Sequence, residues 1–440
     1  MRSRLLGAAL FALALCARAA IAQDQPITRE EYNRLQNTVN RMQQEIDALK
    51  KDKAAQQAQL DQMKKGQVSQ EDMDKIIDDI QKDIRDNRSL LGSLKHGTTK
   101  LVIAGDADAG FTARQHENSN FEATFAPLFL WQINEKILFE GGLDISVERN
   151  DANENETAVD LTLANMSYLV NNNLVLTGGL FVVPFGVHHL HFDPPWINKL
   201  PDDPLPFGDG GIAPSSELGA MASGAFMIAG TRMTYAVYVT NGPGLITDDP
   251  DAAGMLDFDN FTDLNNDKAI GGRLSWLPVR EFEIGASIMR ASVNPDGFDK
   301  NVNALLWAVD ANYTKELDWL KGQLNLRAEW VWNNVEDVTY HPTGSPPLRF
   351  DNNRNGGYVQ IAYRPTMADS KIIRNFEFPV RYDRLEASLD APGGDREQRV
   401  TIGIDYWLAP NAVLKVAYQI DDKEVGEDQN AFLMQFGLGL

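Results

Sequence analysis

The feature that most constrains this chain is a change of residue period near position 100. From there to the C-terminus, segments that mostly have 10–14 residues recur between clusters of Asn, Asp, Gly and Pro. The segment 399–406, for example, reads RVTIGIDY, in which polar and apolar residues alternate. A period of two places the two sets on opposite faces of a β-strand. This part of the chain is therefore expected to be all-β.

The strand-like segments number sixteen, and the lengths of the links between them alternate. The segments are 99–113, 121–133, 136–149, 158–170, 174–184, 218–229, 232–241, 267–277, 281–293, 303–316, 320–333, 355–365, 373–388, 397–408, 411–421 and 430–440. Links after even-numbered segments are short, such as 134–135, whereas most links after odd-numbered ones are long, such as 185–217. Short turns at one end and long loops at the other are typical of a transmembrane β-barrel. We predict an all-β transmembrane barrel of sixteen antiparallel strands over residues 97–440.

Residues 1–22 have the pattern of a secretory signal peptide. Arg2 and Arg4 precede an apolar stretch, 5–15, that is too short to span a bilayer, and Ala20 and Ala22 form a small-x-small cleavage site. After residue 22 no run of about 18 apolar residues occurs, so no transmembrane helix is expected. A mature chain that spans a membrane must then do so as a closed barrel.

Residues 23–96 have a helical period instead. Over 29–65 the apolar residues are spaced alternately by three and four, which is typical of a left-handed coiled coil. One position of the seam is occupied by Tyr32, Val39, Ile46 and Leu60, and the other by Leu35, Met42, Leu49 and Met63, with Lys53 and Gln56 interrupting the third heptad. With an even number of strands, the first strand begins and the last strand ends on the same, periplasmic side of the membrane. We expect this N-terminal α-helical coiled coil on that side. The alternative is a long helix packed on its own barrel.

Charge and composition exclude several classes of function. The chain has 62 acidic residues against 41 basic ones, a formal net charge of −21. So acidic a protein is a poor ligand for nucleic acid. The single cysteine, Cys16, lies in the signal peptide, so the mature chain is expected to be free of cysteine. No GxSxG, HExxH, P-loop or CxxC motif occurs, and we predict neither an enzyme nor a cofactor.

Two motifs resemble those of the phosphate-selective (O/P-type) porin superfamily. Residues 179–186, GLFVVPFG, look like its G-x-F-x-x-PFG signature, and Asn241-Gly242 after 235–239 resembles a second motif. Large apolar residues in alternate positions of 431–440 resemble the C-terminal signal read by the barrel-assembly machinery. Siderophore- and dicarboxylate-porin relatives combine such a barrel with an N-terminal coiled coil. The resemblance implies an outer-membrane porin and a homotrimer.

Candidate pore-lining residues follow from the alternation within the segments. We expect the charged residues on the polar face to line the lumen as opposed basic and acidic walls, which would set ion preference. They are Arg273, Arg327, Arg381, Arg399 and Lys415 on the basic side, and Glu140 and Asp144 on the acidic side. The alternative is that these charges pair with one another and fill the barrel.

The longest link, 186–217, follows the fifth segment and resembles the infolded constriction loop of porins. The candidate constriction residues are His188, His189, His191, Asp193, Trp196 and Lys199. On an extended segment His189 and His191 would share a side, but the sequence specifies no third ligand, so no metal site is predicted. Phosphate-selective porins have arginine and lysine ladders, whereas this link has one lysine and no arginine. Phosphate selectivity is therefore not carried over.

The sequence thus predicts a passive diffusion channel for small hydrophilic solutes, with anions as one option. The barrel would lie in the bacterial outer membrane, in contact with its lipid, and the N-terminal region in the periplasm. The main alternative is a coiled-coil-tethered surface receptor for a metal chelate or siderophore. The aspartate-rich link 242–266 is either a solvated acidic loop or a calcium-bridging one.

Overall fold

The structure is a computed structural model that describes residues 100–149, 155–208, 210–258, 266–294 and 301–440. The chain divides into two units, Met1–Thr98 and Thr99–Leu440, and the described residues all belong to the second. The predicted signal peptide and coiled coil lie outside the described residues. Within the described part, no helix has the length and apolar character needed to cross a membrane.

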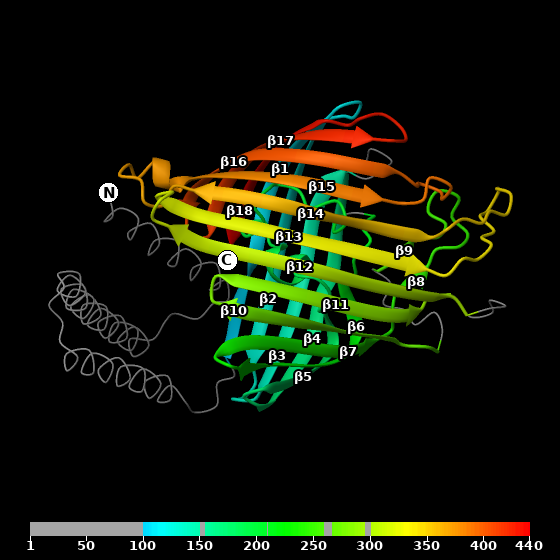
Figure 1. The fold of residues 1–440 in the computed structure, drawn as a ribbon, viewed down its shortest axis with the longest axis horizontal. Coiled ribbons are helices and arrows are strands. Elements are labelled where there is room, and N and C mark those ends of the chain that lie inside the picture. The colour runs from blue at the N-terminus through cyan, green and yellow to red at the C-terminus, as the bar shows by residue number, and fades with distance from the viewer. Residues whose placement is uncertain (1–99, 150–154, 209, 259–265, 295–300) are drawn as a thin grey trace, which may run out of the picture. The chain divides into compact units, whose positions relative to one another are not determined.

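Sixteen antiparallel strands close into one barrel, as predicted (Figure 1). Strands that are neighbours in the barrel are joined by hydrogen bonds, and β1 pairs with β18 to complete the ring. The barrel strands are β1 (Lys100–Arg114), β2 (Asn120–Gln132), β3 (Ile137–Arg149), β4 (Asn155–Asn171), β5 (Leu174–Val182), β6 (Ser216–Ile228), β7 (Thr231–Thr240), β10 (Ala269–Val279), β11 (Phe282–Ser292), β12 (Asn303–Leu317), β13 (Gly322–Val335), β14 (Asn353–Arg364), β15 (Phe376–Glu386), β16 (Arg396–Ala409), β17 (Ala412–Lys423) and β18 (Ala431–Gly439). Closure gives every strand a partner on both edges, which a bilayer requires.

A short hairpin of β8 (Gly244–Leu245) and β9 (Leu256–Asp257) lies in the loop after β7. Neither strand was predicted, because two residues are too few to show a period. Two further short elements are the π-helix η1 (His188–Phe192) and the 3-10 helix η2 (Ile373–Asn375). The short turns lie at one end of the barrel, and the long loops extend from the other, at the right in Figure 1.

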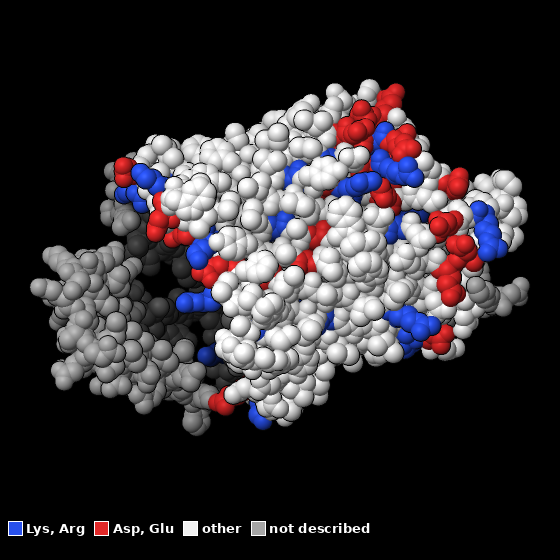
Figure 2. Space-filling view, viewed as in Figure 1, with Lys and Arg blue, Asp and Glu red and all other residues white. Residues whose placement is uncertain are grey.

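The outer surface of the barrel is apolar. On β16, Ile402 and Ile404 are each 51% exposed, whereas Thr401 and Asp405 on either side of them are buried inside. Figure 2 shows that the outer face is mostly uncharged along the strands, with charged side chains gathered toward the two ends of the barrel. An apolar band around a closed barrel is the surface that lipid solvates.

The interior is filled unevenly. The inward-facing side chains of β11 to β17 are largely buried, whereas those of β1 to β4 are mostly half-buried or exposed. The difference arises because the segment 183–215 folds into the barrel and packs on the wall formed by β11 to β17. Its Val183, Phe185 and Phe207 join an apolar cluster with Met289 and Leu306 of the wall. Open space therefore remains on the β1–β4 side.

A candidate constriction inside the barrel

The infolded segment 183–215, here called the constriction loop, is attached at its start to the far wall of the barrel. Gly186 has φ of +66°, and its backbone N–H donates to Ser287 Oγ at 3.0 Å. The next two N–H groups, of Val187 and His188, donate to the Glu329 carboxylate at 2.8 and 3.0 Å. Glu329 is buried on β13. This carboxylate therefore fixes the direction in which the loop enters the lumen.

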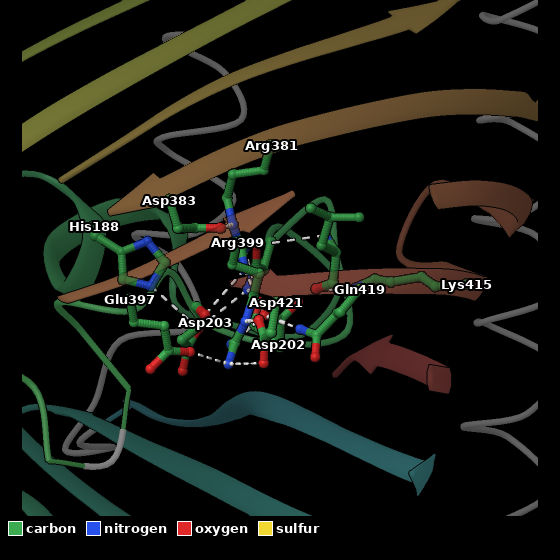
Figure 3. Close-up of polar contacts among 12 residues, drawn as sticks. His188, Asp202, Asp203, Arg381, Asp383, Glu397, Arg399, Lys415, Gln419 and Asp421 are labelled. Carbon is green, nitrogen blue, oxygen red and sulfur yellow. Dashed lines mark hydrogen bonds and ion pairs between the residues drawn. The ribbon is translucent and has the colours of Figure 1, made fainter. Parts of the chain in front are cut away.

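The middle of the loop is held by a network centred on Asp202 (Figure 3). One carboxylate oxygen of Asp202 accepts hydrogen bonds from Arg381 at 2.5 Å and from Gln419 at 2.6 Å. Arg399 lies 3.5 Å from the same oxygen. Arg381 also donates to the backbone oxygens of Asp202 and Asp203, and it pairs with buried Asp383 at 2.9 Å. The loop is thus tied to β15, β16 and β17 at once.

The other predicted basic residues also have specific partners. Arg273 forms a two-pronged ion pair with Asp310 on the wall. Arg327 donates to Ile197 O at 3.3 Å, and its guanidinium lies 3.7 Å from the centre of the Phe192 ring. The Lys415 ammonium donates to Leu200 O at 3.2 Å and to Gln435 at 2.8 Å.

Arg399 completes the basic set and pairs with Asp421 at 2.6 Å and Glu397 at 2.9 Å. All five predicted basic residues point inward, and four of them hold the constriction loop, Arg273 being the exception. Of the five, Arg399 borders the open cavity. That they line the conduction path stays a prediction, and their placement favours the alternative in which the charges pair. On the acidic side, Glu140 and Asp144 lie half-buried on β3, in register with Asn165 and Asp160 of β4.

The predicted loop residues occupy different environments. The Lys199 ammonium pairs with the Glu377 carboxylate at 3.0 Å and lies 5.2 Å from the Trp407 ring centre. The Trp196 indole packs on the backbone of β18 at Gly439. The contact is so close that a Cβ added at Gly439 would come within 2.7 Å of the indole. His191 is exposed. These contacts assign packing to Lys199 and Trp196 and leave His191 exposed.

The histidine pairing expected on an extended segment is wrong. The segment forms the π-helix η1, whose wider turn brings positions four and five residues apart together. His189 Nδ1 lies 3.5 Å and His188 Nε2 3.9 Å from Asp193 Oδ1. His188 Nε2 also lies 3.2 Å from Asp203 Oδ1. His188 and His189 therefore share Asp193, and His191 does not take part.

Burial and neighbouring charges shift the pKa values of His188, His189 and Asp203 in opposite directions. Burial lowers the pKa of His188 and outweighs its bond to Asp203. Burial also disfavours the charged form of His189, but the hydrogen bond and charge of Asp193 outweigh it and raise its pKa. For Asp203, burial is outweighed by the hydrogen bond and charge of His188, so its pKa lies below the usual value. The Asp203 carboxylate is thus charged at neutral pH.

A cavity of about 950 Å³ lies beside the constriction loop. It is bounded by that loop, by β1, β2 and β16 to β18, and by the loop that contains β9. Its charged lining consists of acidic Glu117, Glu122, Asp202, Asp203, Asp257 and Glu397, basic Arg114, Arg399 and Lys423, and His189. Further along the same wall, Asp106 of β1 interacts electrostatically with Asp193, Asp108 and Asp144. The open part of the lumen is thus predominantly acidic.

Sequence reasoning missed Asp202, Asp203, Asp106 and Asp108. The first two lie in the long link, where no period indicates which way a side chain points. Asp106 and Asp108 alternate with small apolar residues in the first segment, so the same alternation that identified Glu140 could have identified them.

A closed sixteen-stranded barrel narrowed by a loop after its fifth strand is the architecture of outer-membrane porins, and comparison with solved structures agrees. The outer-membrane channel DcaP of Acinetobacter baumannii superposes with a TM-score of 0.52 at 12% identity, over 79% of this chain and 99% of that one. For Salmonella typhi OmpF in complex with daunomycin the TM-score is 0.51 at 14% identity, over 77% and 98% of the two chains. Pseudomonas putida OprB gives 0.50 at 12% identity, over 77% and 93%. At these identities the likeness establishes the fold.

In sequence comparison, one family model matches part of the chain. The family model of the phosphate-selective porins O and P matches residues 266–434, which extend from just before β10 into β18. No curated protein sequence matches the chain. The match agrees with the resemblance of the motifs at 179–186 and 241–242, which lie outside the matched range.

Proposed function

We propose that this chain is an outer-membrane porin through which small hydrophilic solutes diffuse down their gradient. The observation that carries the proposal is the cavity beside the infolded loop. The strands close without a gap, the outside is apolar, and the interior retains polar space next to a loop held by buried ion pairs. Such an arrangement forms a fixed, water-filled narrowing through which a solute passes without a conformational change.

The charges in this cavity favour cations and neutral solutes over anions. Acidic residues outnumber basic ones in its lining, and the predicted basic wall is largely covered by the constriction loop. A low-dielectric wall of one sign attracts the opposite ion into the opening. Of the options that the sequence left open, we therefore propose a preference for cations over anions.

Assembly and location complete the proposal. We place residues 97–440 in the bacterial outer membrane as a homotrimer, inserted by the barrel-assembly machinery. Residues 1–22 would be removed on export, and residues 23–96 would form a periplasmic coiled coil that joins the three chains. Deleting residues 24–95 and weighing the detergent-solubilised complex tests the last point. A complex with fewer than three chains supports the coiled coil as a joining element. A complex that still holds three chains shows that barrel contacts suffice.

Solute passage is tested by swelling of liposomes that contain the purified protein. Neutral sugars of increasing size should enter at falling rates, because the constriction loop limits the cross-section. Liposomes that hold correctly folded barrels but do not swell with the smallest sugar would contradict the proposed channel.

A further inference from the structure

Three potential metal ligands meet on the constriction loop. His188, His189 and Asp193 each offer one ligand atom, and these atoms all lie within 4.8 Å of one another. Asp193 Oδ1 lies 3.5 Å from His189 Nδ1 and 3.9 Å from His188 Nε2. A tetrahedral Zn²⁺ with bonds of about 2.0–2.2 Å separates its ligand atoms by roughly 3.3–3.6 Å. The observed separations need only small side-chain movements to reach that geometry.

A further carboxylate, that of Asp203, lies beside one of the three ligands. Asp203 Oδ1 lies 3.2 Å from His188 Nε2, the same nitrogen that would bind the ion. Asn198 Nδ2 donates to this oxygen at 3.1 Å and so holds the carboxylate in place. Asp203 lies outside the group of ligand atoms that fall within 4.8 Å of one another, so its carboxylate must move closer to complete a shell of two imidazoles and two carboxylates. Imidazole nitrogens favour Zn²⁺ and similar ions over Mg²⁺ and Ca²⁺, which prefer oxygen ligands throughout.

The surroundings hold the histidines in position. The His188 ring packs against Phe207 and Tyr358, with centroid distances of 5.0 and 6.0 Å, and His189 lies 5.5 Å from Phe207. The backbone N–H of His188 is fixed by Glu329 on β13 at 3.0 Å. A ligand set whose rings and backbone are both held loses little freedom when an ion binds. His189 and Asp203 also border the 950 Å³ cavity, which gives an ion a route to the site.

We propose that His188, His189 and Asp193, with Asp203, bind one divalent transition-metal ion of the Zn²⁺ type at the constriction. The ion would cross-link the π-helix to the middle of the loop. It would also place a positive charge in the acidic part of the lumen. The second consequence rests on the proposed channel function, whereas the binding itself does not.

Calorimetric titration of Zn²⁺ into the purified full-length protein in detergent tests the binding. His189→Gln removes a partly exposed ligand, and His191→Ala is the matched control, because His191 lies in the same π-helix outside the cluster. Wild type and His191→Ala should bind one high-affinity equivalent that Mg²⁺ does not displace, and His189→Gln should bind that equivalent at least tenfold more weakly. Equal Zn²⁺ binding by wild type and His189→Gln, or no such equivalent in the wild type, would overturn the site.

A spectroscopic and an electrical readout separate this inference from the channel proposal. Co²⁺ bound by two imidazoles and two carboxylates should give visible absorption bands in wild type and His191→Ala that are lost in His189→Gln. Wild-type bands from a protein that conducts no ions would retain the site and overturn the channel. If the channel conducts, micromolar Zn²⁺ should reduce its cation current in wild type and not in His189→Gln, and equal reduction in both would contradict an effect exerted from this site.

Discussion

At the scale of single residues, Asp202 holds the constriction loop against the wall. Its carboxylate accepts from Arg381 and Gln419, and the Arg381 guanidinium is fully buried. Replacing Asp202 by Asn keeps the shape but removes the charge, and a charge-assisted bond in a buried setting contributes about 1–3 kcal/mol. We expect Asp202→Asn to lower the thermal midpoint of the barrel, followed by circular dichroism in detergent.

The exposed Asp251, in the loop after β7, offers a matched control for this change. Asp251→Asn alters the net charge equally and should leave the midpoint unchanged. Equal midpoints for both variants would show that Asp202 is not an anchor of the loop.

The inward direction of Arg381 and Arg399 could be predicted from the sequence, because both alternate with apolar residues along their strands. Their partner Asp202 could not, because it lies 179 residues from Arg381 in a link without a period. Which loop residue meets which wall residue depends on the path of the whole loop. The same limit applies to His188 and His189, which sequence spacing on an extended chain placed on different sides.

At the scale of elements, the path of the constriction loop begins at Gly186. Its φ is +66°, and a Cβ there would lie 1.6 Å from Glu329 Oε1. Gly186→Ala should therefore displace the Glu329 carboxylate from the Val187 and His188 N–H groups and move the loop into or out of the lumen. We expect a changed single-channel conductance in planar bilayers, together with reduced stability.

Gly230 provides the control for backbone strain alone. It has φ of +81° in a short turn, and a Cβ there would meet nothing within 4 Å. Gly230→Ala carries the positive-φ cost of about 1–2 kcal/mol without the clash. Its conductance should match the wild type. A Gly186→Ala channel with wild-type conductance would mean that Glu329 does not set the position of the loop.

The strands themselves were predictable, because a barrel wall must be apolar outside and polar within over its whole length. That requirement imposes a period of two on every strand, and turn residues mark the ends. The hairpin β8–β9 and the π-helix η1 arise instead from local contacts of long loops, and neither has a period long enough to read. The fold was thus accessible from the sequence, and the interior arrangement of the loops was not.

At the scale of the whole molecule, the constriction loop divides the lumen into a filled side and an open side. The filled side contains most of the predicted basic residues, and the open side is lined mainly by carboxylates. Glu122→Gln on β2 removes one of these charges and should lower the cation-to-anion permeability ratio, measured as reversal potential in a KCl gradient. The effect should be larger near 0.1 M than near 1 M salt, where the screening length falls from about 10 to about 3 Å.

Glu281→Gln is the control for selectivity, because Glu281 lies half-buried in the short turn before β11, outside the cavity lining, and pairs with Lys315 at 3.6 Å. It should leave the reversal potential unchanged. A Glu122→Gln channel as selective as the wild type would indicate that the path avoids this wall.

The central claim is that the full-length protein is an open, cation-preferring channel, and recording in a planar bilayer tests it most directly. Purified, folded protein should produce discrete current steps in KCl, grouped in threes if the trimer forms, with a reversal potential displaced toward that of K⁺. Folded protein that inserts without producing steps would contradict the channel, and steps that reverse toward the potential of Cl⁻ would contradict the account of the acidic lumen.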